Sequence, residues 1–173
     1  MPEDWSKLRD IDPLADAGVR IEFSIPLSEF PRLRAQLAHT DGLASGSVRF
    51  GRRDGAAIAH VHLSAIPGLR CQRCLEPMRL SVSGDDTVAL VADDAEAGRA
   101  PAGLDTVLAP GHRLSVRDLA EEELLLSLPL VALHAEGQCA PQPAAEAAPE
   151  TGAGGAETQR PFERLGELLR RDK

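Results

Sequence analysis

Three cysteines and one histidine are the side chains of this sequence most suited to chemistry. Cys71 and Cys74 are separated by two residues, and Cys139 follows His134 by five positions. Tetrahedral zinc takes four nitrogen or sulfur ligands, commonly from two closely spaced pairs. The four side chains therefore predict a zinc site of three thiolates and one imidazole. The alternative is three separate thiols, with His134 as a polar surface residue.

The Cys71 and Cys74 pair has a second possible use, as a redox pair. Thioredoxin-like pairs lie at the N-terminus of a helix, whose dipole lowers the pKa of one thiol. Here Pro77 and the alternating run RLSVS follow the pair, which indicates a strand. A thiol redox switch is therefore the less favoured reading. In the zinc site, the nearby Arg70 and Arg73 would favour the deprotonated thiols that bind the ion.

Other candidates for catalysis are weak. His60 and His62 share one face of a predicted strand but have no third ligand, so ordinary surface or cross-strand packing is expected. Glu121, Glu122 and Glu123 would point in different directions on a helix, so a solvated helix face is expected. The sequence has no Gly-x-Ser-x-Gly motif and no Gly-rich phosphate loop. We therefore predict that the protein is not an enzyme.

Arginines gather in the sequence around the cysteine pair. Between positions 49 and 79 there are six arginines, and the only acids are Asp54 and Glu76. The formal net charge is −8, but residues 118–159 hold eight acids and no Lys or Arg. Because RNA phosphates are bound by Lys and Arg, the first segment predicts an RNA-binding surface, against the alternative of ordinary solvated charges. The candidates are Arg49, Arg52, Arg53, Arg70, Arg73 and Arg79.

The elements that must position these side chains follow from the periodicity of apolar residues. Residues 19–25 alternate as a strand does, and residues 28–38 predict a helix. Short alternating runs over 43–91, broken at GRRDG, at the cysteine pair and at GDD, predict an antiparallel meander with the cysteines at a hairpin tip. The strongest helix begins at Ser115 and stops at Pro129. The expected fold is α+β, with a meander of about four to six strands packed against two main helices.

Composition divides the chain into four parts. Residues 1–18 are expected to be a flexible segment, and residues 19–139 a single α+β domain. Ala, Pro, Gly and Glu dominate residues 140–159, which predicts a disordered linker. Residues 160–173 predict a basic amphipathic helix, suited to docking on a partner or on its own domain. Its apolar stripe consists of Phe162, Leu165, Leu168 and Leu169.

The sequence also bears on the compartment. No apolar run is long enough to span a bilayer, and none has the basic flank of a signal peptide. A cytoplasmic protein is therefore expected. In that reducing compartment, three cysteines are better suited to a metal or to catalysis than to a structural disulfide.

Taken together, these motifs resemble the YceD family, the large ribosomal RNA subunit accumulation proteins of bacteria and plastids. The resemblance rests on CQRCLEP after an alternating strand, on EEELLLSLPLVALH running into the His134 and Cys139 pair, and on PFERLGELL. Its strongest points are Cys71, Arg73, Cys74, Glu123, Leu128, Pro129, His134, Cys139, Pro161 and Phe162.

The resemblance implies a non-enzymatic role in 23S rRNA accumulation and large-subunit assembly. The implied partners are 23S rRNA or its precursor and large-subunit ribosomal proteins, with no membrane and no small-molecule substrate. An alternative from another class is a zinc-stabilised adaptor that binds a protein through its C-terminal peptide and does not touch RNA.

Overall fold

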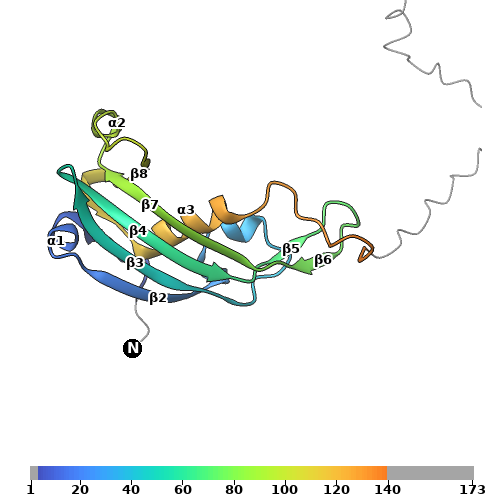
Figure 1. Cartoon of the computed structure of the whole chain (residues 1–173). Coiled ribbons are helices and arrows are strands. Elements are labelled where there is room, and N and C mark those ends of the chain that lie inside the picture. The colour runs from blue at the N-terminus through green and yellow to red at the C-terminus, as the bar shows by residue number, and fades with distance from the viewer. Residues whose placement is uncertain (1–3, 140–173) are drawn as a thin grey trace, which may run out of the picture. The chain divides into compact units, whose positions relative to one another are not determined.

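The computed structural model describes residues 4–139, and its main element is a five-stranded sheet in the order β2-β3-β4-β7-β8 (Figure 1). The first four strands pair antiparallel in succession, and β8 runs parallel to β7. The strands are β2 (Arg20–Pro26), β3 (Leu43–Arg53), β4 (Ala56–Ala65), β7 (Val82–Val91) and β8 (Asp105–Leu108). With helix α3 (Val116–Ser127) packed on β4 and β7, the expected α+β class is confirmed.

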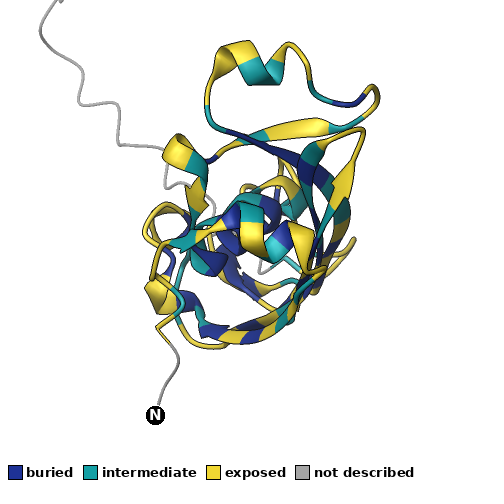
Figure 2. Ribbon diagram, turned by 90° about the vertical axis from the view of Figure 1, so that its left-hand side faces the viewer, coloured by how far each residue is buried: buried dark blue, intermediate teal, exposed yellow. Residues whose placement is uncertain are grey.

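The sheet buries one face and leaves the other to solvent. Along β4, the side chains of Ala59, Val61 and Leu63 are fully buried, while His60 and His62 between them are not. Strands alternate their side chains in this way when only one face meets a core. Figure 2 shows α3 lying within the curve of the sheet, on the buried side.

Helix α3 begins where the sequence predicts. The Ser115 hydroxyl accepts a hydrogen bond from the Asp118 backbone N–H at 3.0 Å, as a helix N-cap does. Leu119, Ala120 and Leu124 are buried against the sheet. The helix ends at Ser127, two residues before Pro129. Among residues 4–139, no helix has the length and apolarity that a bilayer crossing requires.

The helix predicted over residues 28–38 does not form. The chain makes two short 3-10 turns instead, η1 (Leu27–Glu29) and η2 (Leu33–Ala35). Phe30 between them is extended, with φ −91° and ψ 104°, because the ring of Pro31 disfavours the helical conformation in the preceding residue. Phe30 and Leu33 are nevertheless fully buried, so their apolar pattern reflects the core and not a helix.

The break predicted at GDD is also wrong, because Gly84, Asp85 and Asp86 lie inside β7. Gly84 faces α3, and a Cβ atom there would lie 2.6 Å from the Ser127 hydroxyl and closer still to the Glu123 carboxylate. The missing side chain thus allows helix and strand to approach, and no turn is needed.

The three glutamates of α3 are not simply a solvated face, as the sequence predicts. Glu121 is 2% exposed, and its carboxylate accepts hydrogen bonds from the backbone N–H groups of Arg32 at 2.7 Å and Leu33 at 3.0 Å. Glu123 is 8% exposed, and only Glu122 reaches solvent readily. Glu121 therefore holds the η2 turn against the helix.

Part of the expected flexible segment at residues 1–18 is ordered. Strand β1 (Arg9–Asp10) pairs with β9 (Arg113–Leu114), and α1 (Ile11–Asp16) buries Ile11 and Ala15 in the core. Two further short elements, α2 (Asp94–Ala97) and η3 (Pro110–His112), precede β9. The predicted linker over residues 140–159 and the stripe of Phe162, Leu165, Leu168 and Leu169 lie outside the described residues.

A small hairpin between β4 and β7 carries the cysteine pair. It consists of β5 (Gly68–Arg70) and β6 (Pro77–Arg79), which pair antiparallel. The hairpin has its own small cluster of buried residues, separate from the main core: Leu69, Cys71, Cys74, Met78 and Ala132.

Candidate metal centre

The turn of the hairpin brings Cys71 and Cys74 to one side. The Cys71 N–H donates to the Glu76 carbonyl at 3.0 Å, and the Leu75 N–H donates to the Cys71 carbonyl at 2.8 Å. Leu75 has φ 65°, a left-handed conformation that costs a residue with a Cβ about 1–2 kcal/mol. The surrounding contacts therefore impose a turn that this residue disfavours.

The second half of the site comes from the segment that follows α3. Hydrogen bonds to backbone carbonyls tie this segment to the hairpin: the Gln72 N–H donates to the Ala132 carbonyl at 2.9 Å, and the side-chain Nη2 of Arg73 donates to the His134 carbonyl at 3.3 Å. The His134 N–H lies 3.5 Å from the Cys71 sulfur. Sequence reasoning missed these backbone contacts because they leave no pattern in residue types.

The four predicted ligands meet at one point. Cys71 Sγ lies 3.8 Å from Cys139 Sγ, and His134 Nδ1 lies 3.3 Å from Cys74 Sγ and 3.8 Å from Cys139 Sγ. All four ligand atoms are within 4.8 Å of one another. Zinc bonds of about 2.3 Å to sulfur and about 2.0 Å to nitrogen give tetrahedron edges of about 3.8 Å and about 3.5 Å. The three distances given are close to these edges, so the Cys3His cluster could hold a tetrahedral metal ion.

The protein environment already favours a thiolate at Cys71. Burial alone raises the pKa of this thiol, but the backbone N–H groups of Cys74, His134 and Arg73 donate to its sulfur and lower the pKa to about 5. The Glu76 N–H lowers the pKa of Cys74, but burial and the sulfurs of Cys71 and Cys139 together raise it. The Cys71 thiol is therefore prepared for a cation, while the raised pKa of Cys74 favours its neutral form until a positive charge joins the cluster.

Arg73 supplies positive charge next to the cluster. Its Nε donates to Cys139 Sγ at 2.9 Å, and this hydrogen bond is the main cause of the raised pKa of the arginine. Three thiolates, one imidazole and a divalent cation carry a net negative charge, which a neighbouring guanidinium offsets. Arg70 makes a different contact, because its Nη1 donates to the Leu75 carbonyl at 2.9 Å.

The hairpin has only a small core of its own. Its buried cluster contains five residues, of which two are the cysteines themselves. Small clusters of this kind bury too little apolar surface to order their segments unaided, and metals commonly supply the rest. A bound ion would join the hairpin tip to the chain after α3.

The six candidate RNA-binding arginines do not form one surface. Arg49, Arg52 and Arg53 lie on β3 near the turn into β4, while Arg70, Arg73 and Arg79 lie on the hairpin. These two places are at opposite ends of the sheet (Figure 1). The arginines that are clustered in the sequence therefore lie in two separate groups in the structure.

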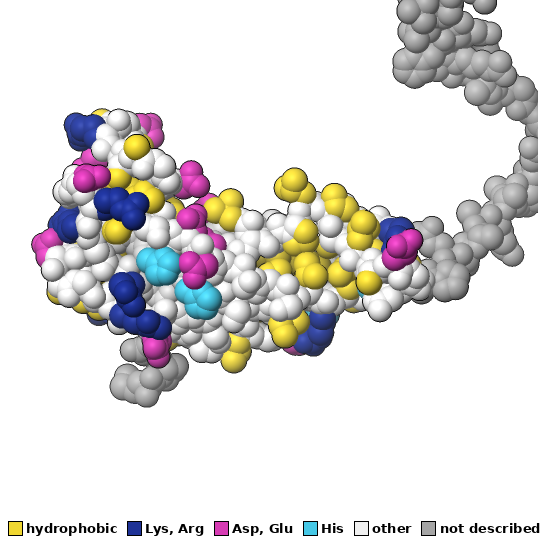
Figure 3. All heavy atoms as spheres, in the orientation of Figure 1, with side chains coloured by type: hydrophobic (Ala, Val, Ile, Leu, Met, Phe, Trp, Pro, Cys, Tyr) yellow, Lys and Arg dark blue, Asp and Glu magenta, His cyan; other side chains and the backbone are white. Residues whose placement is uncertain are grey.

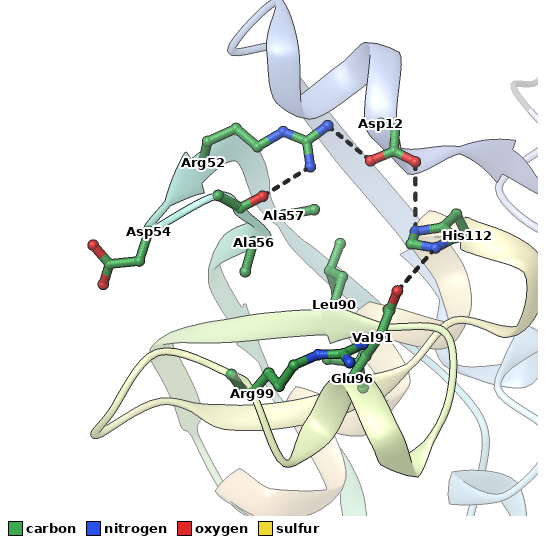
Figure 4. A pocket seen from close by; sticks show the side chains of 12 residues that line it. Asp12, Arg52, Asp54, Ala56, Ala57, Leu90, Val91, Glu96, Arg99 and His112 are labelled. Atoms are coloured by element: carbon green, nitrogen blue, oxygen red, sulfur yellow. Dashed lines mark hydrogen bonds and ion pairs between the residues drawn. The ribbon is translucent and has the colours of Figure 1, made fainter.

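Arg52 has a structural role at its end of the sheet. Its Nε donates to Asp16 at 2.8 Å and its Nη2 to Asp12 at 2.8 Å, which ties α1 to β3. Figure 4 shows this pair beside His112, whose ring lies 3.4 Å from Asp12 and 3.4 Å from Glu96. Of the six arginines, Arg49, Arg53 and Arg79 have no side-chain hydrogen bond or ion pair within residues 4–139.

His60 and His62 lie on the solvent face of the sheet. His60 Nδ1 is 3.1 Å from the Thr87 hydroxyl, and His62 Nδ1 is 3.0 Å from the Asp85 carboxylate, both across the strand pair β4 and β7. The face drawn in Figure 3 shows the histidines beside acidic side chains. The only metal-ligand group found among the described residues is the Cys3His cluster, so these histidines make cross-strand pairs.

A comparison with protein-family models identifies a match. The family model described as "Large ribosomal RNA subunit accumulation protein YceD" matches residues 59–169, which include both halves of the Cys3His cluster. No curated protein and no solved structure matches the chain.

Proposed function

The chain belongs to the YceD family, whose name states a role in large ribosomal RNA subunit accumulation, and we propose that it is a non-enzymatic assembly factor for the large subunit. In this proposal the protein binds 23S rRNA, its precursor or a large-subunit ribosomal protein, and it acts in the cytoplasm. The match over residues 59–169 is the observation that carries the proposal, because it covers most of β4, the hairpin, β7, β8 and α3.

In this role the Cys3His cluster holds zinc as a structural ion. Catalytic zinc sites keep one position open for water or substrate, whereas structural sites are filled by four protein ligands. Here four protein atoms converge, which supports a structural ion and a non-enzymatic role. Zinc would hold the chain after α3 against the hairpin tip and fix the surface that both present.

In this proposal, RNA is contacted by the candidate arginines whose side chains form no hydrogen bond or ion pair within residues 4–139. Arg49 and Arg53 on β3 and Arg79 on the hairpin are exposed and lack side-chain partners within residues 4–139. Guanidinium groups in this state can neutralise phosphates without first breaking an ion pair. Arg52 and Arg73, which are engaged in the fold and the cluster, are better explained as positioning residues.

An adaptor that binds only protein is the second candidate, because apolar side chains lie exposed around the cluster. Leu130 is 99% exposed, and Leu75, Val131 and Leu133 are about half exposed. Figure 3 shows hydrophobic side chains gathered over the hairpin half of this face. Contiguous apolar surface of this kind commonly marks a protein interface.

Electrophoretic shift with 23S rRNA fragments over a salt series separates the two candidates. Direct phosphate contact predicts an affinity that falls as salt rises, and replacing Arg49, Arg53 and Arg79 by alanine should weaken binding and flatten the salt slope by up to about 0.9 per lost contact. Arg99→Ala is the control, since Arg99 is exposed, has no side-chain hydrogen bond or ion pair within residues 4–139, and lies outside the three proposed RNA-contact positions. Absence of any shift at low salt would leave the adaptor as the explanation.

A further inference from the structure

A groove separate from the metal cluster lies between α3 and β8, the edge strand of the sheet. Its volume is about 280 Å³. The floor is apolar, formed by Val61 of β4, Val88 of β7 and Leu119 of α3. Leu126, near the C-terminal end of α3, lines the groove and is 68% exposed although it is a leucine.

All the ionisable side chains that line the groove are carboxylates. They are Asp105 of β8 and Glu122 and Glu123 of α3. Glu122 pairs with Arg32 at 2.6 Å, but Asp105 and Glu123 form no ion pair with a Lys, Arg or His among residues 4–139. The groove therefore combines an apolar floor with uncompensated negative charge.

Glu123 is an unusual member of this set because it is 8% exposed. Burial of a carboxylate without a cation is unfavourable, and one that must stay buried is normally paired. The pKa of Glu123 is raised, mainly by burial and then by the nearby charges of Asp86 and Asp85. A hydrogen bond from Ser127 opposes this shift. An incoming cation would relieve both the desolvation and the repulsion between the acids.

We propose that this groove binds an arginine or lysine side chain from a basic segment of a partner protein. The aliphatic stem of such a side chain would cover Val88 and Leu119, while its charged head would meet Glu123 and Asp105. RNA does not suit the groove, because the carboxylates repel phosphates. The inference deepens the proposed function and rests on it, since protein segments rich in arginine and lysine are what an assembly factor meets beside RNA phosphates.

The test uses the purified full chain and a short fluorescent peptide rich in arginine and leucine. A matched peptide carries citrulline, which has the same shape without the charge, in place of each arginine. The arginine peptide should bind and the citrulline peptide should not. Glu123→Gln and Asp105→Asn should each weaken binding about tenfold. Leu126→Ser should also weaken binding, and because Leu126 is exposed this variant keeps the fold.

The control is Glu29→Gln, which removes an exposed acid beside β2, the opposite edge of the sheet. This variant should bind the arginine peptide as the wild type does. Equal binding of both peptides would overturn the proposal, because the charge of the arginines would then play no part. An equal loss in Glu29→Gln and Glu123→Gln would also overturn it, because attraction to the overall negative charge would then explain the binding. The peptide assay contains no ribosomal particle, so its failure is distinct from a failure of the chain to associate with large-subunit precursors.

Discussion

The Nε atom of Arg73 lies 2.9 Å from the Sγ atom of Cys139, although the two residues are 66 positions apart in the chain. This contact joins the hairpin tip to the chain after α3 and places a positive charge against the sulfur of a candidate metal ligand. The hairpin and the segment after α3 are thus joined at the four candidate ligands and at the neighbouring arginine.

Replacing one ligand tests whether zinc holds this unit together. Cys71→Ser should lose the zinc that the purified wild type retains, and the free energy of unfolding should fall by about 3 kcal/mol when free zinc is a hundredfold above its Kd. Elemental analysis and thermal unfolding measure the two effects. His62→Asn removes a histidine outside the cluster and should change neither. Wild-type protein that carries no zinc after gentle purification in zinc-containing buffer would contradict the assignment.

The two hairpin arginines allow a matched comparison. Arg73→Ala should weaken zinc binding about 10- to 100-fold, because a thiolate ligand loses its charged hydrogen-bond donor. Arg70→Ala removes a contact to the Leu75 carbonyl and should leave zinc affinity close to that of the wild type. Competition with a chromogenic chelator measures both affinities. Equal losses in the two variants would show that only general positive charge matters.

Glycine at position 84 should be required for packing and not for a turn. Gly84→Ala places a methyl group against the carboxylate of Glu123 and the hydroxyl of Ser127, which should destabilise the fold by about 1–3 kcal/mol. Gly51→Ala on β3 is the matched control, since its Cβ would have only an ordinary contact with Ile58. Chemical denaturation of both variants gives the comparison. A neutral Gly84→Ala would mean that α3 and β7 are less closely packed.

The buried carboxylate of Glu123 predicts a pH dependence of stability. Its pKa in the folded chain is raised above the ordinary value of 4.5, mainly by burial. At pH values between 4.5 and the raised pKa, the folded chain therefore holds more protons than the unfolded chain. The free energy of unfolding should therefore fall as pH rises through this window. Glu123→Gln should reduce that fall, as measured by denaturation at a series of pH values, whereas the exposed Glu29→Gln should not. An unchanged profile in Glu123→Gln would exclude a raised pKa.

Much of this architecture is predictable because the sheet buries only one face. The alternation of Val61 and Leu63 with His60 and His62 fixes β4 and its orientation, and Ser115 with Pro129 bounds α3. The metal cluster is predictable for a different reason. Three cysteines and a histidine are the residue types that zinc binds, in the number that a tetrahedral site requires. The site can therefore be predicted even though its two halves are far apart in the sequence.

The remaining features depend on contacts that leave no local pattern. A glycine in the sequence is consistent either with a turn or with a close approach of a helix to a strand. The position of Glu123 opposite Gly84, which only the structure shows, identifies the close approach. Glu121 is buried because it accepts hydrogen bonds from backbone groups nearly ninety positions away. The candidate arginines are separated in space because the turn after β3 and the hairpin lie at opposite ends of the sheet. The helix predicted over residues 28–38 is absent because Pro31 disfavours the helical conformation at Phe30.

The most direct test is sedimentation of the tagged wild type and of Cys71→Ser through a sucrose gradient, with crosslink mapping and measurement of precursor 23S rRNA in the same cells. The account predicts that the wild type migrates with large-subunit precursors and crosslinks to their rRNA or proteins. It also predicts that Cys71→Ser shifts towards the free fraction and lets precursor rRNA accumulate. Wild-type protein found only in the free fraction, with precursor rRNA unchanged when the protein is removed, would contradict the account.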